Sequence, residues 1–173
     1  CNHSLFLVTM DNKRLLVVGG SGFIGSHLVR RALSLNWSVV SLSLSSFKLE
    51  PEIGKDFRHH SVNLLDKHKL AETLTGRDFD YVINCGGYID HRSFAHGGKE
   101  IFSVHFEGLL NLIDSINTAK IKKLINIGSS DEYGQSTAPQ SEDDTEKPIS
   151  PYSLAKVSSA KLLKMLHLTD NFP

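Results

Sequence analysis

Apolar residues in this chain follow two spacings that alternate from one end to the other. Short runs in which apolar residues are consecutive or alternate are typical of strands in a sheet. They occupy 14–18, 38–44, 57–62, 80–84 and 124–127. Other segments repeat apolar residues every three or four positions, as on one face of a helix. These segments are 22–35, 66–75, 99–119 and 151–168.

Strands that alternate with helices indicate crossover connections, which make the strands parallel and place helices on both faces of the sheet. The expected fold class is therefore α/β, a doubly wound parallel sheet of the Rossmann-like kind. No repeat or linker divides the chain, so we expect one domain over 10–173 and an N-terminal extension over 1–9. Such a sheet usually has six strands, and this chain is expected to stop before the sixth, which would begin at 171–173.

Charge and cysteine content narrow the class of protein. The 19 Lys and Arg residues balance the 19 Asp and Glu residues, which gives no basis for binding nucleic acid or an anionic membrane. Cys1 and Cys85 are the only cysteines and lack zinc-site spacing, so we expect a cytoplasmic protein without a bound metal. No apolar run reaches the length that a membrane-spanning helix requires.

Three glycines lie between the first predicted strand and the helix after it. Gly19, Gly22 and Gly25 have the order of a phosphate-binding turn. The first glycine allows the tight turn, the second lets a pyrophosphate approach the backbone, and the third lets helix and strand pack closely. The start of the helix adds free N–H groups that attract an anion. The sequence therefore predicts a dinucleotide-binding domain, with an ordinary structural turn as the alternative.

The last predicted helix carries a phenol and an ammonium on one face. Tyr152 and Lys156 are one turn apart in it, and Ser150 and Pro151 are suited to begin it as N-cap and first residue. The pair Ser129–Ser130 follows the fifth predicted strand, at the carboxyl edge where sheets of this type bind ligands. We expect the hydroxyl, phenol and ammonium groups to converge beside the bound cofactor.

Three segments together resemble the extended short-chain dehydrogenase/reductases, in particular the nucleotide-sugar epimerase/dehydratase group. They are Gly19–Gly25, Ser129–Ser130 and Pro151–Lys156, in the order and on the elements expected. The resemblance implies an NAD(P)-dependent epimerase, dehydratase or 4-keto reductase that acts on a nucleotide-activated sugar. It also implies a homodimer through helices 99–119 and 151–168. The substrate-binding lobe of the family would follow this chain, so neither the sugar nor the nucleotide can be identified here.

The resemblance implies a role for each reactive side chain. Tyr152 would take the proton of a sugar hydroxyl, Ser130 or Ser129 would hydrogen-bond the reacting oxygen, and Lys156 would hold the ribose and favour the phenolate. Asp131 and Glu132 resemble the acid and base of the dehydratases. The apolar residue that usually precedes the following Tyr-Gly pair is missing, which leaves open which serine and which carboxylate act. A surface turn is the alternative for the two acids.

The resemblance also implies cofactor contacts beyond the three glycines, Tyr152 and Lys156. They are Phe23, Ile24, Ser43, Asn63, Leu64, Cys85 and Gly86. The acidic residue that usually ends the second strand and binds the ribose is replaced by the serine-rich segment 41–46, with Lys48 nearby. NAD and NADP both stay open, with a slight preference for NADP, because serine hydroxyls and a lysine tolerate a 2′-phosphate.

Two further alternatives stay open at this point. His105 takes the place of an asparagine that is common in the long helix of the family, and a core-packed histidine is the simplest interpretation. A dinucleotide-sensing or regulatory protein on the same fold is the alternative to an enzyme. The complete set of catalytic residue types favours the enzyme.

Overall fold

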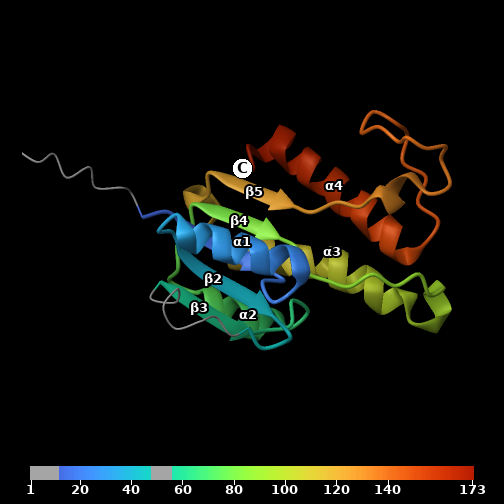
Figure 1. The fold of residues 1–173 in the computed structure, drawn as a ribbon. Coiled ribbons are helices and arrows are strands. Elements are labelled where there is room, and N and C mark those ends of the chain that lie inside the picture. The colour runs from blue at the N-terminus through green and yellow to red at the C-terminus, as the bar shows by residue number, and fades with distance from the viewer. Residues whose placement is uncertain (1–11, 48–55) are drawn as a thin grey trace, which may run out of the picture.

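The computed structural model describes residues 12–47 and 56–173 and shows strands and helices that alternate along the chain (Figure 1). The predicted extension 1–9 and Lys48 lie outside the described residues. The strands are β1 Arg14–Val18, β2 Ser38–Ser43, β3 Phe57–Ser61, β4 Tyr81–Asn84 and β5 Lys123–Asn126. The α-helices are α1 Phe23–Ser34, α2 Lys67–Leu74, α3 Gly98–Ser115 and α4 Pro151–Asp170. Short 3-10 helices are η1 Phe94–His96, η2 Thr118–Lys120 and η3 Ser130–Tyr133.

The five strands form one parallel sheet in the order β3-β2-β1-β4-β5. Leu16 at the centre of β1 pairs with Val40 of β2 on one side and Val82 of β4 on the other. The predicted doubly wound α/β fold is confirmed. The chain winds outward in both directions from β1, so a crevice is expected beyond the carboxyl ends of β1 and its neighbours.

Apolar side chains from the two faces of the sheet form two separate cores. Val17 and Val39 pack with Val29 and Leu33 of α1, which covers one face. The other face is larger, because α2, α3 and α4 all contribute to it. Its core includes Leu16, Leu42, Leu70, Leu74, Val82, Leu112 and Leu124. The alternation along the strands explains this arrangement, since successive residues point to opposite faces.

Most predicted element ends are within one or two residues of those observed, and the long helix differs most. The spacing predicts a helix to residue 119, but α3 ends at Ser115. Ile116 turns to an extended conformation, which leaves its side chain only 8% exposed against the core. Burial of this side chain therefore outweighs the helical repeat. Residues 118–120 form η2 instead.

The start of α4 has the predicted cap. The Ser150 hydroxyl accepts a hydrogen bond from the Ser153 N–H, and Pro151 is the first helical residue. Helix α4 packs side by side with α3 and lies next to the chain that follows β5 (Figure 1). The Ser159 hydroxyl of α4 donates to the His105 carbonyl of α3. The two helices thus hold their polar side chains in fixed positions beside the carboxyl edge of the sheet.

Candidate active site

The glycine turn after β1 is shaped by close backbone contacts. Gly19 has a φ of +76°, and a Cβ atom there would lie 2.7 Å from the Cys85 carbonyl oxygen. A Cβ at Gly25 would lie 2.2 Å from the Gly19 carbonyl oxygen. The turn is anchored on β2, because the Gly19 N–H donates to the Leu42 carbonyl at 2.7 Å. Gly19 and Gly25 therefore have the structural roles that the sequence predicts.

Gly22 is less restricted than its neighbours, although a side chain there would still require a small shift of the turn. A Cβ atom at Gly22 would meet only the Gly19 carbonyl oxygen, at 3.2 Å. Gly20, which the sequence did not single out, is far more restricted, since a Cβ would lie 2.1 Å from the buried Ser41 hydroxyl of β2. Gly22 also precedes the first residue of α1, where N–H groups are free to bind an anion. The open backbone at Gly22 fits the approach of a pyrophosphate.

Two cavities meet over this turn. The first, of about 310 Å³, extends from the turn to the ends of β2 and β3 and is lined by Gly19, Gly22, Ser43, Asn63, Leu64, Cys85 and Gly86 among others. The second, of about 390 Å³, extends toward α4 and is lined by Gly19, Gly22, Phe23, Ile24, Gly25, Cys85, Gly86, Ser129, Tyr152 and Lys156 among others. The turn and the end of β4 line both. The structure thus brings every residue of the predicted cofactor set to one elongated site.

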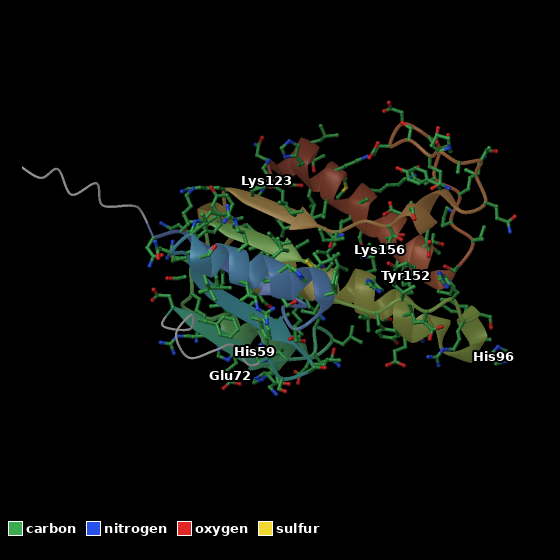
Figure 2. All side chains as sticks on the ribbon, viewed as in Figure 1. His59, Glu72, His96, Lys123, Tyr152 and Lys156 are labelled. Carbon is green, nitrogen blue, oxygen red and sulfur yellow. The ribbon has the colours of Figure 1, made fainter. Side chains whose placement is uncertain are left out.

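Tyr152 and Lys156 lie at buried positions on α4 (Figure 2). Both line the second cavity. Their exposed fractions are 4% and 7%. The Lys156 ammonium donates to the Ile127 carbonyl just after β5 at 2.8 Å, and lies 5.8 Å from the centroid of the Tyr152 ring. Burial lowers the pKa of Lys156, and the Glu132 carboxylate partly opposes that shift. The ammonium is therefore fixed beside the phenol by a backbone contact.

The two predicted serines are adjacent in the chain, but the turn after β5 places them in different surroundings. Ser129 lines the cavity together with Tyr152 and Lys156. Its hydroxyl also accepts a hydrogen bond from the Asp131 N–H at 3.2 Å, as the cap of η3. Ser130 begins η3, is exposed, and is not among the residues that line either cavity. Position therefore favours Ser129, because it is the one of the two serines that lines the cavity with Tyr152.

Asp131 and Glu132 have partners of their own in the structure. Asp131 Oδ2 lies 2.6 Å from Nε2 of His91, which follows β4. Glu132 Oε1 accepts a hydrogen bond from the Ser129 N–H at 2.8 Å and so closes the capping box of η3. Neither carboxylate lines the cavities. Their predicted acid and base roles stay a prediction, and Glu132 has a clear structural role.

His105 is buried, as the core-packed interpretation predicts, and it also lies against Tyr152. Its ring is 7% exposed, lines the second cavity, and meets the Tyr152 ring edge to face with centroids 5.0 Å apart. Nε2 donates to the Tyr88 carbonyl at 2.9 Å, because a carbonyl can only accept. Burial lowers the pKa of His105. Gly87 makes room for the ring, since a Cβ there would lie 2.2 Å from Cε1.

Sequence reasoning identified Cys85 and Gly86 after β4 as part of the site, but not the residues that follow them. Gly87 and Tyr88 line both cavities, and Ile89 lines the second. The only sequence signal was the glycine pair Gly86–Gly87 at the end of a strand, because such glycines often mark a place where another group approaches the backbone closely. At Gly87 this group is the His105 ring. The contact joins positions far apart in the chain, which no local pattern reports.

The fold and this site define a dinucleotide-binding α/β domain, because a glycine turn between β1 and α1 opens into a cavity at the switch point of the sheet. The sequence model of the NAD dependent epimerase/dehydratase family matches residues 15–172. The chain belongs to that family.

The curated proteins that this chain resembles are named as enzymes of UDP-sugars. Over 165 residues the chain is 27% identical to the UDP-glucose 4-epimerase of Bacillus subtilis, covering 91% of this chain and 49% of the relative. It is 28% identical over 135 residues to a UDP-N-acetyl-alpha-D-glucosaminuronate decarboxylase of Bacillus cytotoxicus, covering 76% of this chain and 41% of the relative. The chain spans about half the length of the curated relatives it matches.

A solved structure extends the likeness to the fold. The UDP-N-acetylglucosamine 4-epimerase of Methanobrevibacter ruminantium, determined in complex with UDP-N-acetylmuramic acid, superposes with a TM-score of 0.79 at 27% identity. The match covers 94% of this chain and 53% of that one. The Rossmann-like domain is thus shared with an enzyme of the nucleotide-sugar group.

Two other findings concern the described residues alone. Over 12–47 and 56–173, no group of three or more His, Cys, Asp or Glu side chains is arranged to hold a metal ion. Within the same ranges, no helix has the length and apolar character needed to cross a membrane.

Proposed function

We propose that the full-length protein is an enzyme that transfers a hydride between a ring carbon of a nucleotide-activated sugar and NAD or NADP. The observation that carries the proposal is the convergence of Tyr152, Lys156 and Ser129 on a cavity that continues to the glycine turn. The names of the relatives, which act on UDP-sugars, support this substrate class.

The reacting groups divide the work as their chemistry requires. When bound, the dinucleotide supplies the hydride acceptor or donor. The Lys156 ammonium favours the phenolate form of Tyr152, the phenolate oxygen takes the proton of the sugar hydroxyl, and the Ser129 hydroxyl hydrogen-bonds the reacting oxygen. Because Lys156 is buried and fixed on the Ile127 carbonyl, its charge acts on the phenol with little screening by water.

Epimerisation and keto reduction need only these groups, whereas dehydration also needs an acid and a base at neighbouring carbons. The two carboxylates that would serve are held by His91 and by the Ser129 N–H, outside the cavities. We therefore rank a 4-epimerase or a 4-keto reductase above a dehydratase. The remaining alternative is a non-catalytic dinucleotide sensor, whose function does not require a buried tyrosine and lysine pair.

The test is a comparison of two tyrosine variants of the full-length protein. Tyr152→Phe should reduce hydride transfer with UDP-glucose, UDP-N-acetylglucosamine or a 4-keto nucleotide sugar by about 10²- to 10⁴-fold, the usual contribution of a general acid or base. Binding of the dinucleotide should persist. Tyr81→Phe is the matched control, because Tyr81 stacks on Trp37 on the α1 face, away from both cavities. Equal activity of the two variants would contradict the proposal, as would a wild type that turns over none of these sugars.

We also propose the homodimer that the family resemblance implies. Phe102, Phe106 and Leu110 form a stripe on α3, and Leu110 is 38% exposed. Leu154 and Met165 of α4, which packs beside α3, are 45% and 47% exposed. Helices with apolar outer faces support a four-helix contact with a second copy. The mass of the full-length protein in solution tests this, and a strictly monomeric mass at high concentration would contradict it.

A further inference from the structure

Tyr152 leaves the first turn of α4, where a helix gives its side chains the least support (Figure 2). The N–H groups of a first turn have no partners within the helix, and helix ends fray. A group that transfers a proton must nevertheless be held to within about 0.5 Å of its working position. The Ser150 cap holds the backbone of this turn. The phenol ring therefore depends on contacts with other elements.

Two imidazole rings meet the Tyr152 ring edge to face. The ring of His105 lies with its centroid 5.0 Å away and its plane at 77°. The ring of His91, which follows β4, lies with its centroid 6.0 Å away and its plane at 89°. Nearly perpendicular aromatic pairs at such distances attract each other. Both contacts are made by the rings alone, which suits a phenol whose hydroxyl must act on a substrate.

His91 is itself held through its backbone and through its ring. Its two neighbours form a tight turn, because Asp90 Oδ1 accepts a hydrogen bond from the Arg92 N–H at 2.9 Å and Asp90 Oδ2 accepts one from Arg92 Nε at 2.6 Å. Nε2 of His91 donates to Asp131 Oδ2 at 2.6 Å, since a carboxylate oxygen can only accept. This hydrogen bond joins the segment after β4 to η3, 40 positions farther along the chain. The turn and Asp131 together determine where the imidazole lies.

Asp131 connects the same contact to the candidate serine. Its N–H donates to the Ser129 hydroxyl at 3.2 Å, and Glu132 accepts from the Ser129 N–H at 2.8 Å. A continuous set of contacts therefore joins Ser129, Asp131, His91 and Tyr152. The serine and the phenol come from different elements, and this set holds one relative to the other. It gives the Asp131 carboxylate a use that requires no proton transfer.

The contact between His91 and Asp131 adds little to the stability of the fold. The two side chains are 59% and 38% exposed, and exposed pairs of this kind contribute little. The phenol that the imidazole meets is buried, in contrast. Loss of the pair should therefore affect the position of the phenol, and with it the rate of the reaction, rather than the unfolding of the chain.

We propose that His91 is a positioning residue for Tyr152, and that Asp131 acts through His91 as the acceptor that holds the imidazole. The inference rests on the proposed function, because it assumes that Tyr152 transfers the proton. Neither His91 nor Asp131 touches the reacting atoms. The His91 ring fixes the phenol and Asp131 fixes the ring, so the phenolate oxygen stays within reach of the sugar oxygen that Ser129 hydrogen-bonds.

The experiment measures kcat and KM of the full-length protein with whichever of UDP-glucose, UDP-N-acetylglucosamine or a 4-keto nucleotide sugar it turns over. His91→Ala removes the ring and should lower kcat about 10- to 100-fold, because a displacement of about 1 Å can cost that much. KM should change far less, since the variant removes no contact with the substrate. His91→Phe keeps a ring against Tyr152 and should retain more of kcat than His91→Ala.

Two substitutions of Asp131 separate a positioning role from an acid or base role. Asp131→Asn keeps an oxygen that accepts from His91 Nε2 and should retain most of kcat. Asp131→Ala removes that oxygen and should lower kcat toward the value of His91→Ala. A carboxyl group that transferred a proton itself would lose activity equally in both variants. The double variant His91→Ala/Asp131→Ala should be no slower than His91→Ala, because Asp131 acts through His91.

A matched control removes another histidine of the same segment. His96 lies in η1, its Nδ1 is 2.7 Å from the Ser93 hydroxyl, and it lines neither cavity. His96→Ala should therefore leave kcat as in wild type. The unfolding midpoint of every variant should also equal that of wild type.

Three results would overturn the inference and leave the proposed function intact. They are a wild-type kcat in His91→Ala, an equal loss in Asp131→Asn and Asp131→Ala, and a lower unfolding midpoint in His91→Ala, which would show a structural role. If wild type transfers no hydride with these sugars, or if Tyr152→Phe is as active as wild type, the proposed function fails and this inference with it.

Discussion

The two edges of the same parallel sheet use polar residues in opposite ways. At the amino edge, Asp80 accepts a hydrogen bond from the Arg14 N–H at 2.9 Å and pairs with the Lys122 ammonium at 3.2 Å. These contacts tie β1, β4 and the start of β5 together. At the carboxyl edge, the buried Lys156 ammonium faces a cavity, and the Gly22 backbone lines the same cavity. Polar groups therefore pair with one another at the amino edge, whereas at the carboxyl edge they face a cavity.

This difference shows that the two edges of a parallel sheet serve different functions. All strands end at the same edge, so the residues that follow them meet there, and their loops must leave space for a ligand. At the amino edge the chain only enters the strands, and charged residues are free to pair across them. Variants of groups that face the ligand at the carboxyl edge should therefore change binding or turnover, whereas variants at the amino edge should change stability alone. A variant that overpacks the glycine turn should lower stability as well.

The largest effect is expected where the glycine turn has no room. In Gly25→Ala the new Cβ would lie 2.2 Å from the Gly19 carbonyl oxygen, which is backbone and cannot move aside cheaply. We expect a loss of about 3 kcal/mol in the free energy of unfolding, the upper range for overpacking. Thermal or denaturant unfolding measures it. Unchanged stability would mean that the turn is not packed as described.

A smaller effect, chiefly on binding, is expected three residues earlier. In Gly22→Ala the new Cβ meets only the Gly19 carbonyl oxygen, at 3.2 Å, so the turn must shift by a few tenths of an ångström and the fold should be kept at a small cost in stability. The methyl group stands where a pyrophosphate would approach, and we expect dinucleotide affinity to fall about tenfold, or about 1.4 kcal/mol. Titration with NADPH and NADH checks this. Unaltered affinity for both would show that no phosphate lies against Gly22.

The smallest effect is expected at the amino edge and depends on pH. The Arg14 N–H, and after it Lys122, lower the pKa of Asp80 below its ordinary value of 3.8. The unfolded chain then binds more protons near that value, so this contribution to stability is present above about pH 4 and is lost as the pH falls below it. Asp80→Asn should cost about 1 kcal/mol at neutral pH and flatten the acid dependence of unfolding.

The control for this variant is an ion pair of the same kind that joins exposed side chains. Asp114 pairs with Lys67 at 2.7 Å, and the two side chains are 56% and 63% exposed. Asp114→Asn should have little effect on stability, because exposed pairs contribute little. If Asp80→Asn altered dinucleotide binding as strongly as Gly22→Ala, the division between the two edges would be wrong.

Local patterns predicted most of the fold, because each element depends on residues close in sequence. The apolar run of β1, the turn at Gly19 and the cap at Ser150 are examples, and all three are confirmed. The end of α3 was predicted wrongly because burial of Ile116 is a tertiary effect. The short run over 57–62 also predicted β3, although this strand is largely polar.

The site was predictable only as a set of residues. Contacts between distant segments decide how those residues act, and the sequence does not report them. The Tyr152 ring meets His105 of α3, the Ser129 N–H is capped by Glu132, and His91 bonds to Asp131. The choice between Ser129 and Ser130 likewise needed the direction of the chain after β5. Sequence patterns predict which reactive residue types are present, and the fold determines which residues contact them.

The most direct measurement is a crystal structure of the full-length protein with a dinucleotide and a nucleotide sugar bound. We predict the pyrophosphate at the N–H groups beside Gly22, the nicotinamide ring next to Tyr152 and Lys156, and the reacting carbon about 3–3.5 Å from the nicotinamide. A dinucleotide bound elsewhere, or one whose nicotinamide ring points away from Tyr152, would contradict the proposed function at its centre.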